Sequence, residues 1–382
     1  MTPVAGPSIG LRDLAALRFP LVARPRPICR PLDIRLNQIQ ARADQAEQGG
    51  DDALLRAAEA LNLAALLASD CGMPHLARDL CRRQFVIFHA ARPLTAAHAQ
   101  LALQPAVNLG RIHIRNGDGQ RAFHLFHTLF AALQNQGTAD LDGDAFSLRR
   151  FLRTTDDRRE TSQWLWQVVL SEGTRALTRA GQWQEALTYA TELRGIGLRL
   201  WEGRQITILT QVFGNAPDAA LDLLDHTEIN EPWEAAVHSC LVAMALRAAG
   251  RKTGSHAPQT LATYLDLEPD LTLVDFRTRL GLTIIDILAE DEVVASPIYD
   301  RLLTEATGVG GAHSAREVLT HPGFRARLAP ARISALKSVI KAAALDDAQA
   351  LEGSMEPFLH AVRRSESAAK HRLTGNVTGH AP

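Results

Sequence analysis

The strongest signal for chemistry in this 382-residue sequence is the acidic run Asp156-Asp157-Arg158-Arg159-Glu160. Neighbouring carboxylates on a helix can share a hard cation such as magnesium and, through the cation, hold a diphosphate group. The alternative is that Asp156 and Asp157 cap the first turn of a helix, where carboxylates meet unpaired amides and the positive end of the helix dipole. We favour the capping role, because no second acidic box accompanies the run and one short motif is weak evidence.

A second candidate is a zinc site at His124 and His127. The two histidines can share one face of a helix, but zinc needs further ligands and the neighbouring sequence offers no evident one. The chain also has no Walker loop, no G-x-G-x-x-G after a strand and no G-x-S-x-G elbow. We therefore predict no catalytic residue, no metal and no cofactor, and we favour a protein that is not an enzyme.

Composition narrows the partners and the compartment. The formal net charge of −1 removes any general attraction to nucleic acid or to an anionic membrane. No apolar run reaches the roughly 18 residues that a membrane span requires. The four cysteines form no C-x-x-C pair, which is typical of a reducing compartment. We expect a cytoplasmic protein that neither reads DNA directly nor enters a membrane.

The elements that would position these residues are helices. Leu- and Ala-rich segments alternate with short turns along most of the chain, and no strand alternation stands out, so we predict an all-α fold. The predicted organisation is a Pro- and Arg-rich extended arm over 1–32, a helical repeat domain over 33–290 with a polar insertion at about 134–159, a C-terminal helical region over 291–364 and a disordered tail over 365–382. Within the insertion we expect one short helix near Phe146–Leu152.

Four turns share one spacing, in which an alanine follows a glycine by five residues and an apolar residue follows after four more. A small residue precedes each glycine by seven positions, where it would let the two helices of a hairpin approach closely. The glycine suits the positive φ found just after a helix. The four sets are Ala65/Gly72/Ala77/Cys81, Gly110/Gly117/Ala122/Phe126, Thr174/Gly181/Ala186/Ala190 and Thr207/Gly214/Ala219/Leu223.

These turns resemble the tetratricopeptide repeat, a helical hairpin that stacks into a curved array. The clearest copies are Asn108-Leu109-Gly110 leading to Gly117-Asp118-Gly119-Gln120-Arg121-Ala122, and Gly181-Gln182-Trp183-Gln184-Glu185-Ala186-Leu187. The resemblance covers residues 50–250 in degenerate form, because the repeat spacing varies and a fifth turn at Gly250 lacks the alanine. It implies an α-solenoid of irregular antiparallel helix pairs, followed by additional C-terminal helices.

In tetratricopeptide arrays the first helix of each pair lines a concave groove, so the resemblance also implies which residues face a partner. Arginines from successive pairs would point into one groove, where guanidinium forks favour carboxylate or phosphate groups. The alternative is a solvated surface on which arginine pairs with nearby carboxylates. The groove residues that this register implies are Asn62, Arg111, Arg115, Arg175, Arg179, Trp201, Arg204 and Arg247.

The sequence thus predicts a regulatory helical-repeat protein that captures an acidic peptide or an acidic protein face in an Arg-lined groove. Its plan is similar to that of bacterial peptide-sensing tetratricopeptide regulators of the Rap type, although a shared fold does not fix a function. Two alternatives stay open. One is an accessory or catalytic component of a biosynthetic, peptide-modifying pathway. The other is an all-α, metal-dependent isoprenoid-type synthase that uses Asp156 and Asp157.

Overall fold

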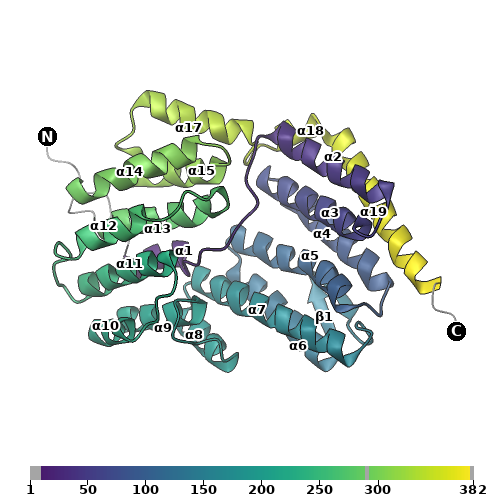
Figure 1. Cartoon of the computed structure of the whole chain (residues 1–382), viewed down its shortest axis with the longest axis horizontal. Coiled ribbons are helices and arrows are strands. Elements are labelled where there is room, and N and C mark those ends of the chain that lie inside the picture. Colours follow the sequence, from purple (N-terminus) through teal and green to yellow (C-terminus); the bar gives the residue numbers. More distant parts are fainter. Residues whose placement is uncertain (1–9, 289–291, 379–382) are drawn as a thin grey trace. The chain divides into compact units, whose positions relative to one another are not determined.

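The computed structural model describes residues 10–288 and 292–378, and nearly all of its elements are helices (Figure 1). The all-α class predicted from the sequence is confirmed. None of the described helices combines the length and the apolar character needed to cross a membrane. The chain divides into two compact units, each built from two separate stretches. We call them the arm unit, Met1–Cys29 with Thr174–Ile340, and the tail unit, Arg30–Gly173 with Lys341–Pro382.

The tail unit consists of long helices, one β-hairpin and the last helix of the chain. That last helix, α19, packs along α2 and α3 and also touches α4 (Figure 1). The elements of the unit are α2 (Leu32–Gln48), α3 (Ala53–Asp70), α4 (Pro74–Ala90), α5 (Ala96–Arg115), α6 (Gly119–Asn135), β1 (Thr138–Leu141), β2 (Asp144–Ser147), most of α7 (Thr155–Arg179), α18 (Ala348–Glu352) and α19 (Met355–Thr378).

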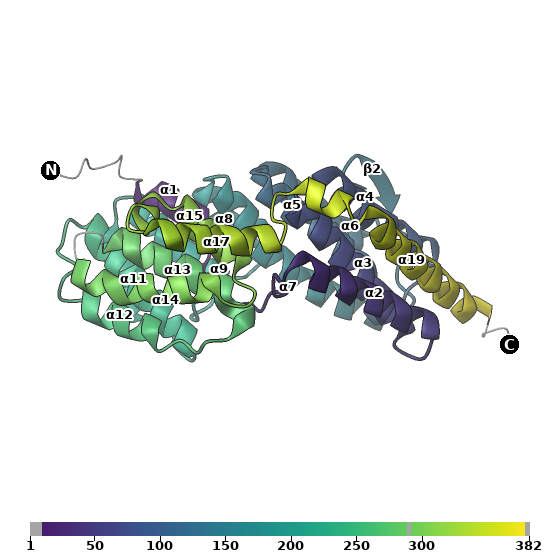
Figure 2. The same cartoon turned by 90° about the horizontal axis from the view of Figure 1, so that it is seen from above.

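The arm unit is a two-layered stack of shorter helices. Helices α9, α11, α13 and α15 pack on one another in chain order, and α12 packs on α14; α11 to α14 lie side by side in both views (Figure 1, Figure 2). Its elements are α1 (Leu11–Arg18), the end of α7, α8 (Trp183–Glu192), α9 (Glu202–Phe213), α10 (Pro217–Asp225), α11 (Pro232–Ala248), α12 (Ala257–Leu265), the 3₁₀ helix η1 (Leu271–Leu273), α13 (Val274–Ile287), α14 (Glu292–Thr307), α15 (Ala312–Thr320), α16 (Pro322–Arg325) and most of α17 (Pro330–Ala342).

The bends predicted from the glycine spacing lie between helices, as expected. Gly72, Gly117, Gly181 and Gly250 adopt positive φ angles of 78°, 83°, 75° and 67°. This left-handed conformation carries no steric penalty for glycine. The fourth predicted turn differs, because Gly214 has a φ of −85° and the positive φ of 59° falls on the next residue, Asn215. Asparagine tolerates this conformation better than most residues, so the bend forms one position later.

The close helix contact predicted at a small residue is present at Gly110. A Cβ atom built on Gly110 would lie 2.2 Å from Cζ of Phe126, which is fully buried. Phe126 therefore packs directly against the backbone of α5, and the α5–α6 pair can approach this closely only with a glycine at position 110.

The short helix expected near Phe146–Leu152 is wrong, because a β-hairpin occupies the insertion. Strands β1 and β2 are antiparallel, with Leu141 opposite Asp144. The two residues between them, Asp142 and Gly143, both have positive φ angles, of 62° and 101°. Asp-Gly is a favoured pair for this two-residue turn, and Leu141 in β1 is buried. The sequence contained this signal, but the charges around it led us to predict a polar insertion with one short helix.

The C-terminal segment contains more helix than expected. In the arm, predicted as extended over 1–32, the sequence also allows a short helix around Leu14 and Leu17; α1 occupies that stretch, and α2 begins at Leu32. The tail, predicted as disordered over 365–382, is helical as far as Thr378. The prediction was wrong because the polar composition of this segment hides a helical stripe of buried side chains, which includes Ala369 and Leu373. Residues 1–9 and 379–382 lie outside the described residues.

We expect Gly110→Ala to lower the free energy of unfolding by about 1–3 kcal/mol, since overpacking against Phe126 outweighs the better helix propensity of alanine. Gly137→Ala is the matched control in the same unit, because a Cβ at Gly137 meets only an ordinary 3.7 Å contact with Ala132. Urea unfolding followed by circular dichroism measures both. Equal midpoints for the two variants would contradict the close-packing role.

Candidate functional site

The tail unit holds three of the residues predicted to face a groove, and each contacts another side chain of that unit. Nε of Arg111 lies 2.7 Å from a carboxylate oxygen of Glu172. NH1 of Arg115 donates to Asp70 at 2.7 Å and to the Ser69 hydroxyl at 2.9 Å. The Asn62 side chain accepts a hydrogen bond from Asn108 at 3.1 Å. The two arginines are therefore neutralised within the fold.

Asp70 is the centre of a charge cluster that joins three helices. Its side chain is only 1 % exposed, and its second oxygen lies 2.5 Å from the guanidinium of Arg35, which is 9 % exposed. Arg35 comes from α2, Asp70 from α3 and Arg115 from α5. The two guanidiniums compensate for the hydration that the buried carboxylate has lost. Arg115 thus has a structural role that the sequence register could not indicate.

In the arm unit, Arg204 and Arg247 hold the ends of neighbouring helices. Arg204 is buried and donates to the carbonyl of Leu223 at 2.6 Å, and Arg247 donates to the carbonyl of Asp286 at 2.6 Å. Carbonyl groups in the last turn of a helix lack partners within that helix, and a guanidinium group satisfies them well. Both arginines therefore stabilise helix C-termini.

The other predicted residues of the arm unit lie near the N-terminal arm or α7. Arg179 donates to the carbonyl of Leu17 at 2.8 Å, while Arg175 is half-buried on α7. The Trp201 ring is 39 % exposed, and the guanidiniums of Arg24 and Arg199 lie 5.6 and 5.2 Å from its centre. The predicted residues are divided between the two units, so the single groove through all of them stays a prediction.

The acidic run caps helices, as we favoured. Asp157 accepts hydrogen bonds from the amide of Ala96 at 2.7 Å and from the hydroxyl of Thr154 at 2.6 Å. The hydrogen bond from the Thr154 hydroxyl, and to a lesser extent those from the amides of Ala96 and Thr154, stabilise the charged carboxylate. They lower the pKa of Asp157. Asp156 is 84 % exposed and pairs with Arg159. The Asp157 carboxylate thus serves the first turns of α5 and α7.

Two of the four cysteines have thiols that are buried and unreactive. Burial raises the pKa of the Cys81 thiol and of the Cys240 thiol to about 12, so both stay protonated at neutral pH. His124 and His127 both lie on the exposed side of α6.

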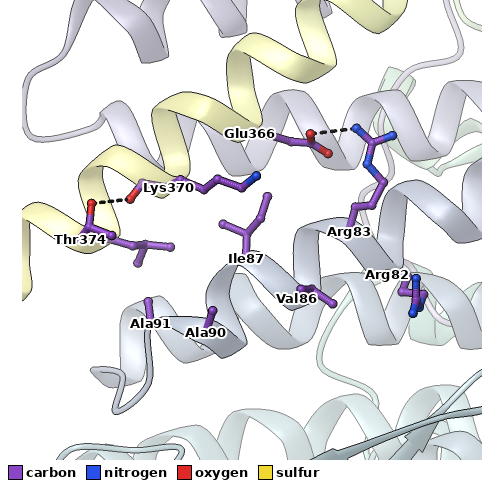
Figure 3. A pocket seen from close by; sticks show the side chains of 10 residues that line it. Arg82, Arg83, Val86, Ile87, Ala90, Ala91, Glu366, Lys370 and Thr374 are labelled. Carbon is purple, nitrogen blue, oxygen red and sulfur yellow. Dashed lines mark hydrogen bonds and ion pairs between the residues drawn. The ribbon is translucent and has the colours of Figure 1, made fainter.

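An open groove lies between α4 and α19 in the tail unit (Figure 3). Its volume is about 450 Å³, and α4 supplies most of the apolar floor. The Val86 side chain is 40 % exposed there, whereas Ile87 and Leu373 are buried beneath the surface. An exposed valine beside buried aliphatic side chains provides an apolar strip that a partner can cover.

Charged side chains border this strip. Arg83 lies 2.8 Å from one oxygen of Glu366, and Arg82 pairs with Asp144. Lys370 is exposed and has no ion-pair partner among the side chains that the structure describes. Figure 3 shows the Lys370 side chain extending across the groove above Ile87. Because both arginines already pair with carboxylates, the basic character of the groove comes from the unpaired ammonium group of Lys370.

One polar atom in the groove also lacks a partner. The second oxygen of Glu366, Oε1, accepts no hydrogen bond from the residues that the structure describes, and the residue is 91 % buried. Sequence reasoning missed the groove because Glu366 and Lys370 belong to the segment predicted as disordered. The helical spacing of apolar residues near Ala369 and Leu373 was the signal that could have found it.

Comparisons with protein-family models, with curated proteins and with solved structures gave no match. The tetratricopeptide resemblance therefore rests on the residues and contacts described above.

We expect Asp70→Asn to lower the free energy of unfolding by about 3–5 kcal/mol, because it leaves the buried Arg35 without its countercharge. Asp156→Asn is the control, since its ion pair is exposed to solvent. Thermal and urea unfolding of both variants measure the difference. If Asp70→Asn unfolded at the same midpoint as Asp156→Asn, the charge cluster would not stabilise the tail unit.

Proposed function

We propose that this chain is a regulatory helical-repeat protein that binds a protein or peptide, and that the α4–α19 groove receives an acidic helical segment of that partner. The supporting observation is the combination of the apolar strip that includes the exposed Val86 with the unpaired ammonium group of Lys370.

The arrangement of helices supports a repeat protein. Bends at glycines, or at the residues beside them, separate the paired helices. In the arm unit, helices α9, α11, α13 and α15 pack on one another in chain order. We interpret these features as an irregular solenoid of tetratricopeptide-like pairs. Such arrays commonly offer extended surfaces for partner binding.

The groove suits a helix better than an extended strand. Two helices border it, and the hydrogen-bonding groups of their backbones are used within the helices, so main-chain pairing with a strand is not available. An amphipathic helix can instead place apolar side chains over Val86 and Ile87 and hold its own backbone bonds internally. Carboxylates on the flank of such a helix would lie near Lys370.

The proposed acidic partner thus moves from the predicted Arg-lined groove to the α4–α19 groove. The reason is physical: the guanidiniums of Arg111 and Arg115 already meet carboxylates of the tail unit. A partner would have to displace these ion pairs before gaining any of its own. Lys370 requires no such exchange, because its ammonium group is only hydrated.

A labelled, designed amphipathic helix with leucine on one face and glutamate on both flanks is a suitable probe for the groove. We expect Lys370→Glu to weaken its binding at least tenfold, which corresponds to about 1.4 kcal/mol, because charge reversal replaces attraction by repulsion. Lys337→Glu is the matched control, since Lys337 is exposed on α17 of the arm unit. Fluorescence anisotropy in low salt measures both affinities.

The same probe with lysine in place of glutamate should bind wild type at least tenfold more weakly. Val86→Asp, at the exposed floor position, should also weaken binding of the glutamate probe, since it places a charge on the apolar strip. Equal affinity of the glutamate probe for the Lys370 and Lys337 variants would exclude this groove as the acidic-segment site.

A further inference from the structure

The N-terminal arm lies against the arm unit as one continuous segment. Helix α1 packs on α13, and the residues that follow it run on in extended form past α9 to η1. Phe19 and Leu21 are only 3 % and 2 % exposed and belong to the core of the unit. The arm therefore fills two apolar positions with side chains from outside the stacked helices.

Side chains of the stack hold the main chain of the arm. The Gln205 amide is fully buried; its oxygen accepts the amide hydrogen of Leu21 at 2.8 Å, and its nitrogen donates to the Leu21 carbonyl at 2.7 Å. Arg179 donates to the carbonyl of Leu17, and the Thr178 hydroxyl donates to that of Phe19 at 3.3 Å. Contacts to backbone groups depend on an extended course more than on a particular side chain.

Three carboxylates of the stack meet three arginines of the arm. Arg18 lies 2.6 Å from Asp286, Arg24 lies 2.6 Å from Glu202, and Arg26 lies 3.6 Å from Asp275. The stacked helices thus bind the arm in three ways: by hydrogen bonds to its backbone, by burial of its apolar side chains and by ion pairs with its arginines.

We infer that this surface, which we call the arm site, is a recognition site for extended protein segments with an apolar-Pro-apolar core flanked by arginines. Residues Leu17–Arg26 of the chain itself are its resident occupant, and an external segment of the same chemistry competes with them. The arm site belongs to the arm unit, so the inference does not depend on the α4–α19 groove.

The pattern of burial indicates how exchange would proceed. The guanidinium-bearing side chains of Arg24 and Arg26 are 48 % and 41 % exposed, so their ion pairs are the weakest part of the contact. Phe19 and Leu21 are the deep anchors. Because the arm is covalently attached, a competitor must overcome its high effective concentration, which is on the order of millimolar for a short flexible connection. Removing the ion pairs of Arg24 and Arg26 should therefore weaken the binding of the arm and open the arm site, while the anchors Phe19 and Leu21 are retained.

A labelled synthetic peptide with the sequence of residues 11–28 is the probe for the test, with the full-length chain as receptor. We expect Arg24→Ala combined with Arg26→Ala to increase the affinity of the chain for this peptide at least tenfold over wild type, because the double variant weakens only the competing arm. Anisotropy measures binding, and the peptide should raise the melting temperature of the double variant by mass action.

Adding Glu202→Gln to the double variant should reduce peptide binding again, since it removes the carboxylate that pairs with Arg24 of the peptide. A peptide in which the three arginines are replaced by glutamate should bind at least tenfold more weakly than the native one. The inference is overturned if wild type and the double variant bind the peptide equally, or if neither binds it while both unfold cooperatively.

The acidic probe for the α4–α19 groove separates this inference from the proposed function. Its affinity should be the same for wild type and the arm variants. Failure of the arm peptide to bind would thus leave the groove experiment unaffected, and failure of the acidic probe would leave the arm site unaffected.

Discussion

The depth of contact between paired helices governs this structure. Phe126 lies against bare backbone at Gly110, and a corresponding contact recurs in the arm unit, where a Cβ on Gly281 would lie 2.5 Å from the Tyr264 hydroxyl oxygen. Both aromatic side chains are fully buried. A helix pair cannot bury its apolar face alone, so each pair must also pack on a neighbouring pair. A glycine where the two helices of a pair touch lets them pack closely enough for this stacking.

Arginine connects the elements that this packing brings together. The chain has only four lysines among its 41 basic residues, and its guanidinium groups serve several structural roles. Arg204, Arg247 and Arg301 donate to carbonyl groups near the ends of helices, whereas Arg35 and Arg115 enclose Asp70. A planar group with five donors can satisfy two or three acceptors at once, which an ammonium group does less well. The helical register therefore placed many arginines on a groove face, but the fold uses most of them internally.

Local patterns predicted the helices and their bends but could not predict which groups would meet. Gly72, Gly117 and Gly181 were found because a left-handed turn has a strong local signature. The Asp142-Gly143 turn had a signature as well, and the charges beside it concealed two strands of only four residues. The ion pair between Arg111 and Glu172 joins residues far apart in the chain, and no spacing rule indicates it. The α4–α19 groove is of the same kind, because α19 reaches α4 only by tertiary packing.

The interleaved connectivity of the two units has a consequence for biosynthesis. Helices α2 and α3 leave the ribosome early, yet α19, which packs along them, is made only after all the helices that lie between them in the chain. At ordinary elongation rates of about 5–20 residues per second, the apolar faces that α19 covers stay open for tens of seconds. The arm likewise emerges before the helices that hold it. A nascent chain of this topology thus carries uncovered apolar surface on α2 and α3 until α19 has been made.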